Sequence, residues 1–401
     1  MEQTFKTLQE TFNSGKTIDL AFRKQQLKKF IEMMTSEKPA IEEAVYKDLK
    51  KPASDVTLNE ISLCINEAKF ALANLEGWAD IEHVDKKMAN LMDTAYIRKD
   101  PKGVALIIAP WNFPIQLALT PMVSLIASGC VGIIKPSEIS PHSSACIKML
   151  VEKHLDTSCY AVIEGEVKEV TALLKLPFNH IFYTGNTFVG KIIMRAAAEH
   201  LATVTLELGG SNPCFVDETV DLKIAAKRIA WLKTNNCGQI CLSINYLLIK
   251  KELVTPFVAH FEQALVEMFG NDVEKSPDYP RIINTNHFDR ISKILNKVHP
   301  EDILLGNKTD KSTLYIAPTL VRTTLKESFI KDEIFGPILP IIPVDDFEEG
   351  IKFAKSLPKP LGSYTFSHDK KLQEAVLSGV ISGTAMINDV LMNMACNSIL
   401  M

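Results

Sequence analysis

Residues 103–134 read GVALIIAPWNFPIQLALTPMVSLIASGCVGII and contain no charged side chain. A run of this length would allow a membrane span. Three prolines within it, together with polar Asn112 and Gln116, disfavour that alternative, because they would break a continuous helix and place polar groups in hydrocarbon. VALIIAP and VGIIKPS have the character of short buried strands, so the run predicts a strand, a turn, a buried helix and a second strand.

The same alternation continues along the chain. After the two opening strands come the apolar runs CYAVIEG, HIFYTG and TVTLELG. The helices expected between and after the five strands cover about 115–129, 141–155, 167–175 and 187–200. Such alternation is typical of a parallel sheet with helices on both faces.

A second series of the same kind begins near Gly209 and Gly210. It comprises CFVD, a helix over about 221–234, NYLLIKK, a helix over 252–269, ILPIIPV and a helix over 346–357. The residues before the first strand read as helices around 22–34 and 59–78. Residues 82–101 are charged and contain the alternating TAYIRK, which predicts a protruding hairpin. The chain is therefore expected to be an α/β protein with two domains.

Composition excludes several classes of protein. A hydrophobic share of 46% and a charged share of 23% indicate a soluble globular protein. The net charge of -4 shows no excess of basic residues of the kind that nucleic-acid binding requires. The amino terminus carries charges from Glu2 onward and has no signal-peptide core, so a cytoplasmic location is expected. The eight cysteines form neither a C-x-x-C pair nor a zinc-spaced cluster, which predicts free thiols and no metal site.

Two cysteines stand close together in NNCGQICLSINY, residues 235–246. Neither Cys237 nor Cys241 obviously fills a core, and each could be a nucleophile. The residues of this stretch alone do not separate the two.

Six short motifs, in this order, resemble those of the aldehyde dehydrogenase superfamily, most closely its class 3 branch. They are PWNFP at 110–114, KPSE at 135–138, FYTGNTFVG at 182–190, LELGG at 206–210, GQIC at 238–241 and EIFGPILP at 333–340. RIINTNHFDRI and INDVLMN resemble class 3 in particular, and the similarity extends from about residue 10 to 395. The resemblance implies two Rossmann-type α/β domains and a small protruding β-hairpin for oligomerisation. It assigns residues 1–81 and 102–208 to an NAD(P)-binding domain, 82–101 to the hairpin and 209–401 to a catalytic domain.

The resemblance also distributes the catalytic roles. Aldehyde oxidation suits a thiolate, which forms a tetrahedral adduct from which hydride can leave, and the matching motif places this role on Cys241. Asn112 and the backbone N–H of Cys241 would stabilise the oxyanion, and Glu207 would activate the water that hydrolyses the thioester. The structural alternatives are that Asn112 is only a turn residue and that Glu207, within what reads as a buried strand, is paired with a basic side chain.

No G-x-G-x-x-G fingerprint is present, although the resemblance implies a nicotinamide cofactor. Gly185 and Gly190 would bracket a loop whose following helix presents its N–H groups to pyrophosphate. A carboxylate at Glu138 would favour NAD, with NADP also possible. The expected cofactor-binding residues are Trp111, Lys135, Ser137, Glu138, Gly185, Asn186, Gly190, Glu333 and Phe335.

The sequence departs from the family's pattern in three places. Ser211 stands where relatives usually have a lysine, and Asn186 stands where a serine is more usual. The chain ends at NSILM, whereas relatives continue through a Pro-Phe-Gly-Gly turn, so we expect a shortened catalytic domain. Cys237, where relatives have a small residue, is expected to be a packing residue or, under oxidation, a disulfide partner of Cys241.

The function expected from the resemblance is NAD(P)-dependent oxidation of fatty or aromatic aldehydes to acids, by a homodimer if the shortened carboxyl terminus allows it. One alternative enzyme would pass the thioester to coenzyme A, but Glu207 argues against it, because such enzymes generally lack the base. The alternative from another class is a weakly active or inactive shortened paralogue that acts as a nucleotide-binding or dimer-partner protein.

Overall fold

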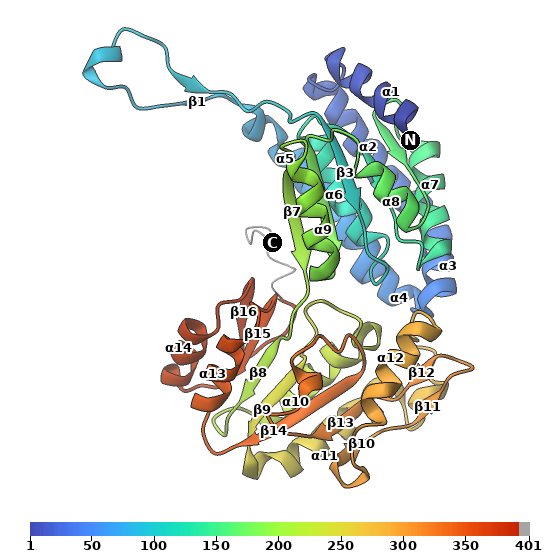
Figure 1. Ribbon diagram of the computed structural model, residues 1–401, viewed down its shortest axis with the longest axis vertical. Helices are drawn as coiled ribbons and strands as arrows, with labels where there is room; N and C mark the ends of the chain where they lie inside the picture. The colour runs from blue at the N-terminus through green and yellow to red at the C-terminus, as the bar shows by residue number, and fades with distance from the viewer. Residues whose placement is uncertain (393–401) are drawn as a thin grey trace. The chain divides into compact units, whose positions relative to one another are not determined.

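A computed structural model describes residues 1–392; Cys396 and the last residue of INDVLMN lie outside this range. The chain forms two compact units. The first unit contains Met1–Asp48 and Ala53–Glu207, and the second contains Leu49–Pro52 and the chain from Leu208 onward (Figure 1).

The first unit is built on a five-stranded sheet with the order β5-β4-β3-β6-β7. Its strands are β3 (Val104–Ile108), β4 (Val131–Lys135), β5 (Tyr160–Val162), β6 (His180–Gly185) and β7 (Thr203–Leu208). β3 pairs in parallel with both β4 and β6, and every residue of β3 and β4 is buried. The uncharged run therefore folds as predicted, with helix α6 (Gln116–Ala127) between its two strands.

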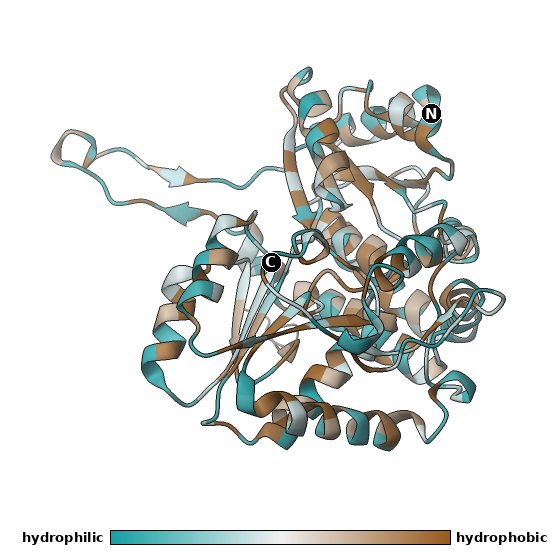
Figure 2. Cartoon of the chain, turned by 60° about the horizontal axis from the view of Figure 1, so that its bottom comes forward, coloured by the Kyte–Doolittle hydropathy of each residue, from teal (hydrophilic) through white to brown (hydrophobic). Residues whose placement is uncertain are grey.

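Helices surround this sheet. Those that follow strands are α7 (Pro141–His154), α8 (Val167–Leu173) and α9 (Thr187–Ala198), as the alternation predicted. The amino-terminal helices are α1 (Glu2–Asn13), α2 (Leu20–Ser36), α3 (Lys38–Leu49), α4 (Ala53–Val56) and α5 (Ser62–Ala79), with a π-helical turn over Thr57–Ile61 before α5. In Figure 2, hydrophobic residues concentrate in the strands and on parts of the helices, whereas many loops are hydrophilic.

A hairpin extends from the first unit (Figure 1). β1 (Glu82–His83) and β2 (Tyr96–Ile97) pair antiparallel, which confirms the hairpin predicted over 82–101. Met88 and Met92, between the strands, are 90% and 98% exposed. Large apolar side chains that remain this accessible are candidates for contact with another protein surface.

The second unit contains a seven-stranded sheet with the order β10-β13-β14-β9-β8-β15-β16. Its strands are β8 (Pro213–Val216), β9 (Tyr246–Lys250), β10 (Ile303–Leu305), β13 (Thr319–Arg322), β14 (Ile338–Val344), β15 (Gly362–Phe366) and β16 (Thr384–Ile387). The pairs are parallel except that between β10 and β13. Its helices are α10 (Leu222–Thr234), α11 (Val254–Phe269), α12 (Thr285–Leu295), α13 (Glu348–Ser356) and α14 (Lys370–Gly379), and β11 (Thr309–Asp310) pairs with β12 (Tyr315–Ile316).

One prediction about burial was wrong. β7, which ends in LEL, was expected to be buried, but it lies at the edge of its sheet and its residues are at least partly exposed. An edge strand has a neighbour on only one side, so an apolar sequence there does not imply burial. The membrane alternative finds no support, since none of the helices formed by residues 1–392 combines the length and hydropathy that a bilayer crossing requires.

Candidate active site

Cys241 differs from the other described cysteines in its accessibility. Cys64, Cys130, Cys146, Cys159, Cys214 and Cys237 are all buried, whereas Cys241 is partly exposed. Burial raises the pKa of the Cys146 thiol to about 12 and that of Cys214 well above its ordinary value. A buried thiol with such a pKa is a poor nucleophile at neutral pH, so among residues 1–392 Cys241 is the thiol best placed to react.

Cys237 is a packing residue in this structure. It is fully buried in a hydrophobic cluster with Tyr279 and Ile282, and its Sγ donates to the carbonyl of Pro280 at 2.9 Å. Burial raises the pKa of its thiol to about 12. These contacts favour packing over a disulfide with Cys241.

The backbone before Cys241 has an unusual conformation. Asn236, Cys237 and Gly238 have consecutive left-handed φ values of 48°, 52° and 69°. Non-glycine residues adopt this region at a cost of about 1 kcal/mol or more each, and such strain persists only where surrounding contacts enforce it. A Cβ on Gly238 would overlap the carbonyl of Gly336, so the Gly-Gln-x-Cys turn packs directly on the EIFGP segment.

Gln239 and Asn212 hold this turn in place. The Gln239 side chain donates to the Arg281 carbonyl at 3.1 Å and accepts from the Ile283 amide at 3.1 Å, which attaches RIINTNH to the cysteine turn. Asn212 is fully buried, and its Nδ2 donates to the carbonyls of Cys241 and Ser243 at 2.7 and 2.9 Å. Asn212 is a residue of this site that no motif indicated, although an amide directly after LELGGS in an apolar setting was a usable signal.

Glu333 is a carboxylate whose environment suits a ligand. Burial raises its pKa to about 7, against the opposing effects of the Gly210 N–H and of the charges on Arg290 and Lys233. Its Oε1 is buried and has no hydrogen-bond partner among the described residues. A Cβ on Gly209 would overlap this carboxylate, so the glycine leaves space for it. Buried acceptors of this kind are normally satisfied, which points to a missing donor such as a ligand hydroxyl.

Lys233 is the buried cation beside this site. It donates from Nζ to the Ile244 carbonyl at 2.8 Å, and burial lowers its pKa to about 7, partly offset by the Glu333 charge. Phe335 is partly exposed, and its carbonyl accepts from Arg290 at 3.3 Å. The residues predicted on EIFGP therefore lie among Lys233, Arg290 and the cysteine turn.

Ser211, the departure from the family's lysine, belongs to a neutral hydrogen-bond network. Its Oγ donates to the Ile330 carbonyl at 2.6 Å and accepts from Asn245 Nδ2 at 2.8 Å. Asn245 is also buried, and its Oδ1 accepts from the Ile334 amide at 2.8 Å. This network attaches the segment that carries Glu333 to the end of the cysteine loop.

In the first unit, Asn112 is buried in the turn between β3 and α6, and Trp111 beside it is partly exposed. The fully buried Glu60 lies on the π-helical turn, and its Oε2 accepts from the Ile115 amide at 2.8 Å. A carboxylate is stabilised at the start of a helix by unpaired amides and the helix dipole. Glu60 therefore fixes the beginning of α6, directly after PWNFP, and it was missed in the sequence.

The KPSE residues form a local cluster at the end of β4. Lys135 is buried and its Nζ contacts Glu138 Oε2 at 2.7 Å, while Glu138 is exposed. The buried Ser137 accepts from the Ile139 amide at 3.3 Å. The ion pair therefore joins a buried ammonium to an exposed carboxylate at the end of β4.

Helix α9 begins where the sequence predicted a phosphate-binding loop. Gly185 ends β6, Asn186 is the exposed N-cap, and Gly190 is buried one turn into the helix. The Asn186 side chain accepts from the Val189 amide at 2.9 Å. Asn186, which stands where a serine is more usual, therefore still caps the helix. The N-terminus of α9 retains its preference for anions.

Glu207 lies on the edge strand β7 and is partly exposed. Burial raises the pKa of its carboxyl, and none of the residues that the structure describes forms an ion pair with it. The alternative in which Glu207 pairs with a basic residue thus finds no support in this range. A carboxyl with a raised pKa is suited to accept a proton near neutral pH.

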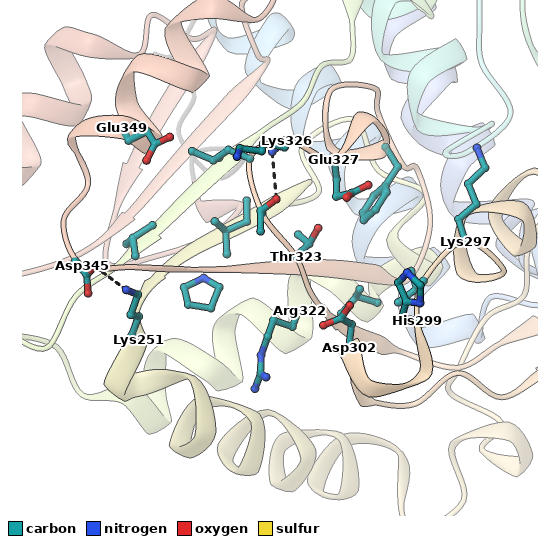
Figure 3. A pocket seen from close by; sticks show the side chains of 18 of the residues that line it. Lys251, Lys297, His299, Asp302, Arg322, Thr323, Lys326, Glu327, Asp345 and Glu349 are labelled. Atoms are coloured by element: carbon teal, nitrogen blue, oxygen red, sulfur yellow. Dashed lines mark hydrogen bonds and ion pairs between the residues drawn. The ribbon is translucent and has the colours of Figure 1, made fainter.

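A cavity of about 880 Å³ lies elsewhere in the second unit, at the carboxyl ends of β13 and β14. Figure 3 shows Lys251 in contact with Asp345 on one side of the cavity, and His299 and Asp302 on the other side. None of the predicted catalytic or cofactor-binding residues lines it. We therefore do not identify this cavity as the active site.

The two units carry the elements of a nicotinamide-dependent oxidoreductase that works through a cysteine. A helix N-terminus after a glycine loop and an unsatisfied buried carboxylate oxygen fit the pyrophosphate and ribose hydroxyls of NAD or NADP. The chain belongs to the aldehyde dehydrogenase family, since the family's model matches residues 1–399.

Named relatives agree with this assignment. Aldehyde dehydrogenase family 3 member A2 of Rattus norvegicus is 41% identical over 400 residues, covering 100% of this chain and 82% of its own. The 4,4'-diaponeurosporen-aldehyde dehydrogenase of Staphylococcus aureus is 38% identical, with 98% of this chain and 86% of its own covered. A solved structure of Staphylococcus aureus AldH in a substrate-bound state superposes with a TM-score of 0.96, at 38% identity and with 98% and 86% of the two chains covered.

The protein is accordingly an NAD(P)-dependent aldehyde dehydrogenase with the aldehyde dehydrogenase fold. It oxidises aldehydes to carboxylic acids through a cysteine thiohemiacetal and thioester. The alternative of an inactive nucleotide-binding paralogue is not favoured.

Proposed function

We propose that Cys241 is the nucleophile and that Asn112 and Glu207 complete the catalytic residues. The observation that carries this proposal is the accessibility of Cys241, the one described cysteine that is not buried. Its thiolate attacks the aldehyde carbon, and the resulting alkoxide accepts hydrogen bonds from the Asn112 amide and the Cys241 backbone N–H. Bound NAD or NADP supplies the hydride acceptor.

Glu207 acts in the second half of the reaction. The carboxylate takes a proton from water as the water attacks the thioester carbonyl, and the carboxylic acid leaves as the Cys241 thiolate is regenerated. The raised pKa of Glu207 brings its basicity closer to that needed at neutral pH.

The first unit would supply most of the cofactor-binding residues. The adenosine ribose would contact Lys135, Ser137 and Glu138, and the pyrophosphate would lie at Gly185, Asn186 and Gly190. Trp111, the neighbour of Asn112, and two residues of the second unit complete the set. These two, Glu333 and Phe335, would approach the nicotinamide ribose. The unsatisfied Glu333 Oε1 supports the last assignment.

The substrate class that we propose is fatty or aromatic aldehydes. Support comes from the resemblance to the class 3 branch and from a relative named for 4,4'-diaponeurosporen-aldehyde. We further infer a homodimer, with the apolar hairpin residues Met88 and Met92 in contact with a second copy. We also infer a cytoplasmic location, because no disulfide joins any of the seven cysteines within residues 1–392.

An aldehyde panel with NAD and with NADP tests the catalytic proposal. The wild type should reduce cofactor with medium-chain and aromatic aldehydes, and Cys241→Ala should abolish this activity. Cys146→Ala, which alters a buried thiol in α7, serves as the matched control and should retain it. Turnover by Cys241→Ala would contradict the assignment.

A further inference from the structure

The side chain of Asn245 connects the two segments on which hydride transfer depends. It lies four residues after Cys241, directly before β9, and is 2% exposed. Its Nδ2 lies 3.1 and 3.0 Å from the carbonyls of Ile330 and Asp332. Its Oδ1 accepts from the Ile334 amide at 2.8 Å, so one amide group binds the backbone on both sides of Glu333.

The opposite end of Asn245 is tied to the nucleophile. Its backbone N–H donates to the Asn212 carbonyl at 2.8 Å, and the Asn212 side chain donates to the Cys241 carbonyl at 2.7 Å. A continuous series of hydrogen bonds thus runs from the Cys241 backbone through Asn212 and Asn245 to the backbone beside Glu333.

This series has a consequence for the proposed chemistry. The hydride leaves a carbon that is bonded to Cys241 Sγ, while Glu333 is proposed to hold the nicotinamide ribose. Transfer between two bound groups depends steeply on their separation, and displacements of about 1 Å can cost about a hundredfold in rate. The distance between the Cys241 and Glu333 segments is therefore a determinant of turnover.

Ser211 takes part in this arrangement on both sides. Its hydroxyl accepts from Asn245 Nδ2 and donates to the same Ile330 carbonyl. A lysine ammonium has donors but no acceptor and could not receive the Asn245 hydrogen bond. Ser211 and Asn245 therefore match each other as neutral partners.

We propose that Asn245, supported by Ser211, is a positioning residue that sets Glu333 relative to Cys241 and so couples the cofactor to the nucleophile. The inference rests on the proposed roles of Cys241 and Glu333. A positioning role differs from a purely structural role in one respect. Loss of the Asn245 side chain should lower the rates of cofactor-dependent steps more than the rates of steps that use only the Cys241 thiol.

Two assays on Asn245→Ala separate these roles. One is NAD reduction with an aromatic aldehyde, and the other is hydrolysis of p-nitrophenyl acetate without cofactor, in which Cys241 is acylated and nitrophenolate leaves. The ratio of dehydrogenase to esterase activity should fall about tenfold, equivalent to about 1.4 kcal/mol of lost positioning. The KM for NAD should rise, while the KM for the aldehyde changes less.

Ser211→Ala is the second variant. It removes one contact of Asn245 but leaves the three backbone contacts, and it should shift the same ratio in the same direction by a smaller factor. Equal loss of both activities, or an unchanged KM for NAD in Asn245→Ala, would overturn the inference. So would an unfolded Asn245→Ala together with a Ser211→Ala that matches the wild type in both assays. A wild type that hydrolyses the ester but never reduces NAD would instead contradict the proposed function.

Discussion

Replacing Asn212 by alanine tests how much this one buried amide contributes to holding the reactive turn. Asn212 makes three side-chain hydrogen bonds, donating to Cys241 and Ser243 and accepting from the Gly362 amide at 2.9 Å. At about 1 kcal/mol for each lost hydrogen bond, Asn212→Ala should lower the free energy of unfolding by about 3 kcal/mol. Loosening of the Cys241 backbone should also lower kcat by about tenfold to about a hundredfold.

Urea unfolding and steady-state kinetics measure the two effects. Asn212→Asp keeps the acceptor for Gly362 but turns a carboxylate toward the Cys241 and Ser243 carbonyls, so it should be no better than alanine. Asn296→Ala, at an exposed position, is the control and should change stability by less than about 0.5 kcal/mol. If Asn212→Ala matched that control in both stability and kcat, the reasoning would be refuted.

Three further variants address the strained turn, the buried lysine and the base. Gly238→Ala should destabilise by about 2–4 kcal/mol in urea unfolding, because its φ is 69° and the added Cβ would overlap the Gly336 carbonyl; wild-type stability would show that the turn can relax. Lys233 has a folded pKa of about 7, below the ordinary 10.5, so the unfolded chain binds its proton more tightly between those values. The free energy of unfolding of the wild type, relative to that of Lys233→Met, should consequently rise from pH 7 to about pH 10.5. Urea titrations at several pH values measure this difference. A difference in unfolding free energy that does not change with pH would argue against a lowered pKa for Lys233. Burial raises the pKa of Glu207, so the rate of deacylation should decline on acidification at a higher pH than it would with an ordinary glutamate as the base. Glu207→Gln should slow deacylation and remove this decline from the pH–rate profile. An unaltered pH–rate profile would show that another group causes the decline.

The apolar runs of the sequence were sufficient to predict the five-stranded sheet and three strands of the seven-stranded sheet, namely β8, β9 and β14. β3, β4 and β14 are short and strongly apolar, and each was recognised by its composition. All of β3 and β4 and the first five residues of β14 are buried. β15 and β16, by contrast, read GSYTF and TAMI and lack a continuous apolar pattern. They form because each lies in register beside a neighbouring strand, which is a tertiary effect that local sequence does not encode.

The site was only partly predictable for a related reason. Motifs located Cys241 and Glu333, but the residues that hold them act through backbone carbonyls and amides far away in the sequence. Asn245, for example, contacts Ile334 across 89 positions. Leu49–Pro52 belongs to the second unit through contacts such as that between the Leu49 carbonyl and the Arg281 amide at 3.0 Å. Such pairings follow from the folded chain and leave no local pattern.

Mass analysis of a trapped intermediate shows which cysteine carries the acyl group. Glu207→Gln, incubated with NAD and an aromatic aldehyde and then digested, should accumulate the acyl thioester because its hydrolysis lacks a base. The acyl mass should lie on the peptide containing Cys241, it should require both NAD and aldehyde, and hydroxylamine should remove it. An acyl group on another cysteine, or none during measurable NADH formation, would contradict the account.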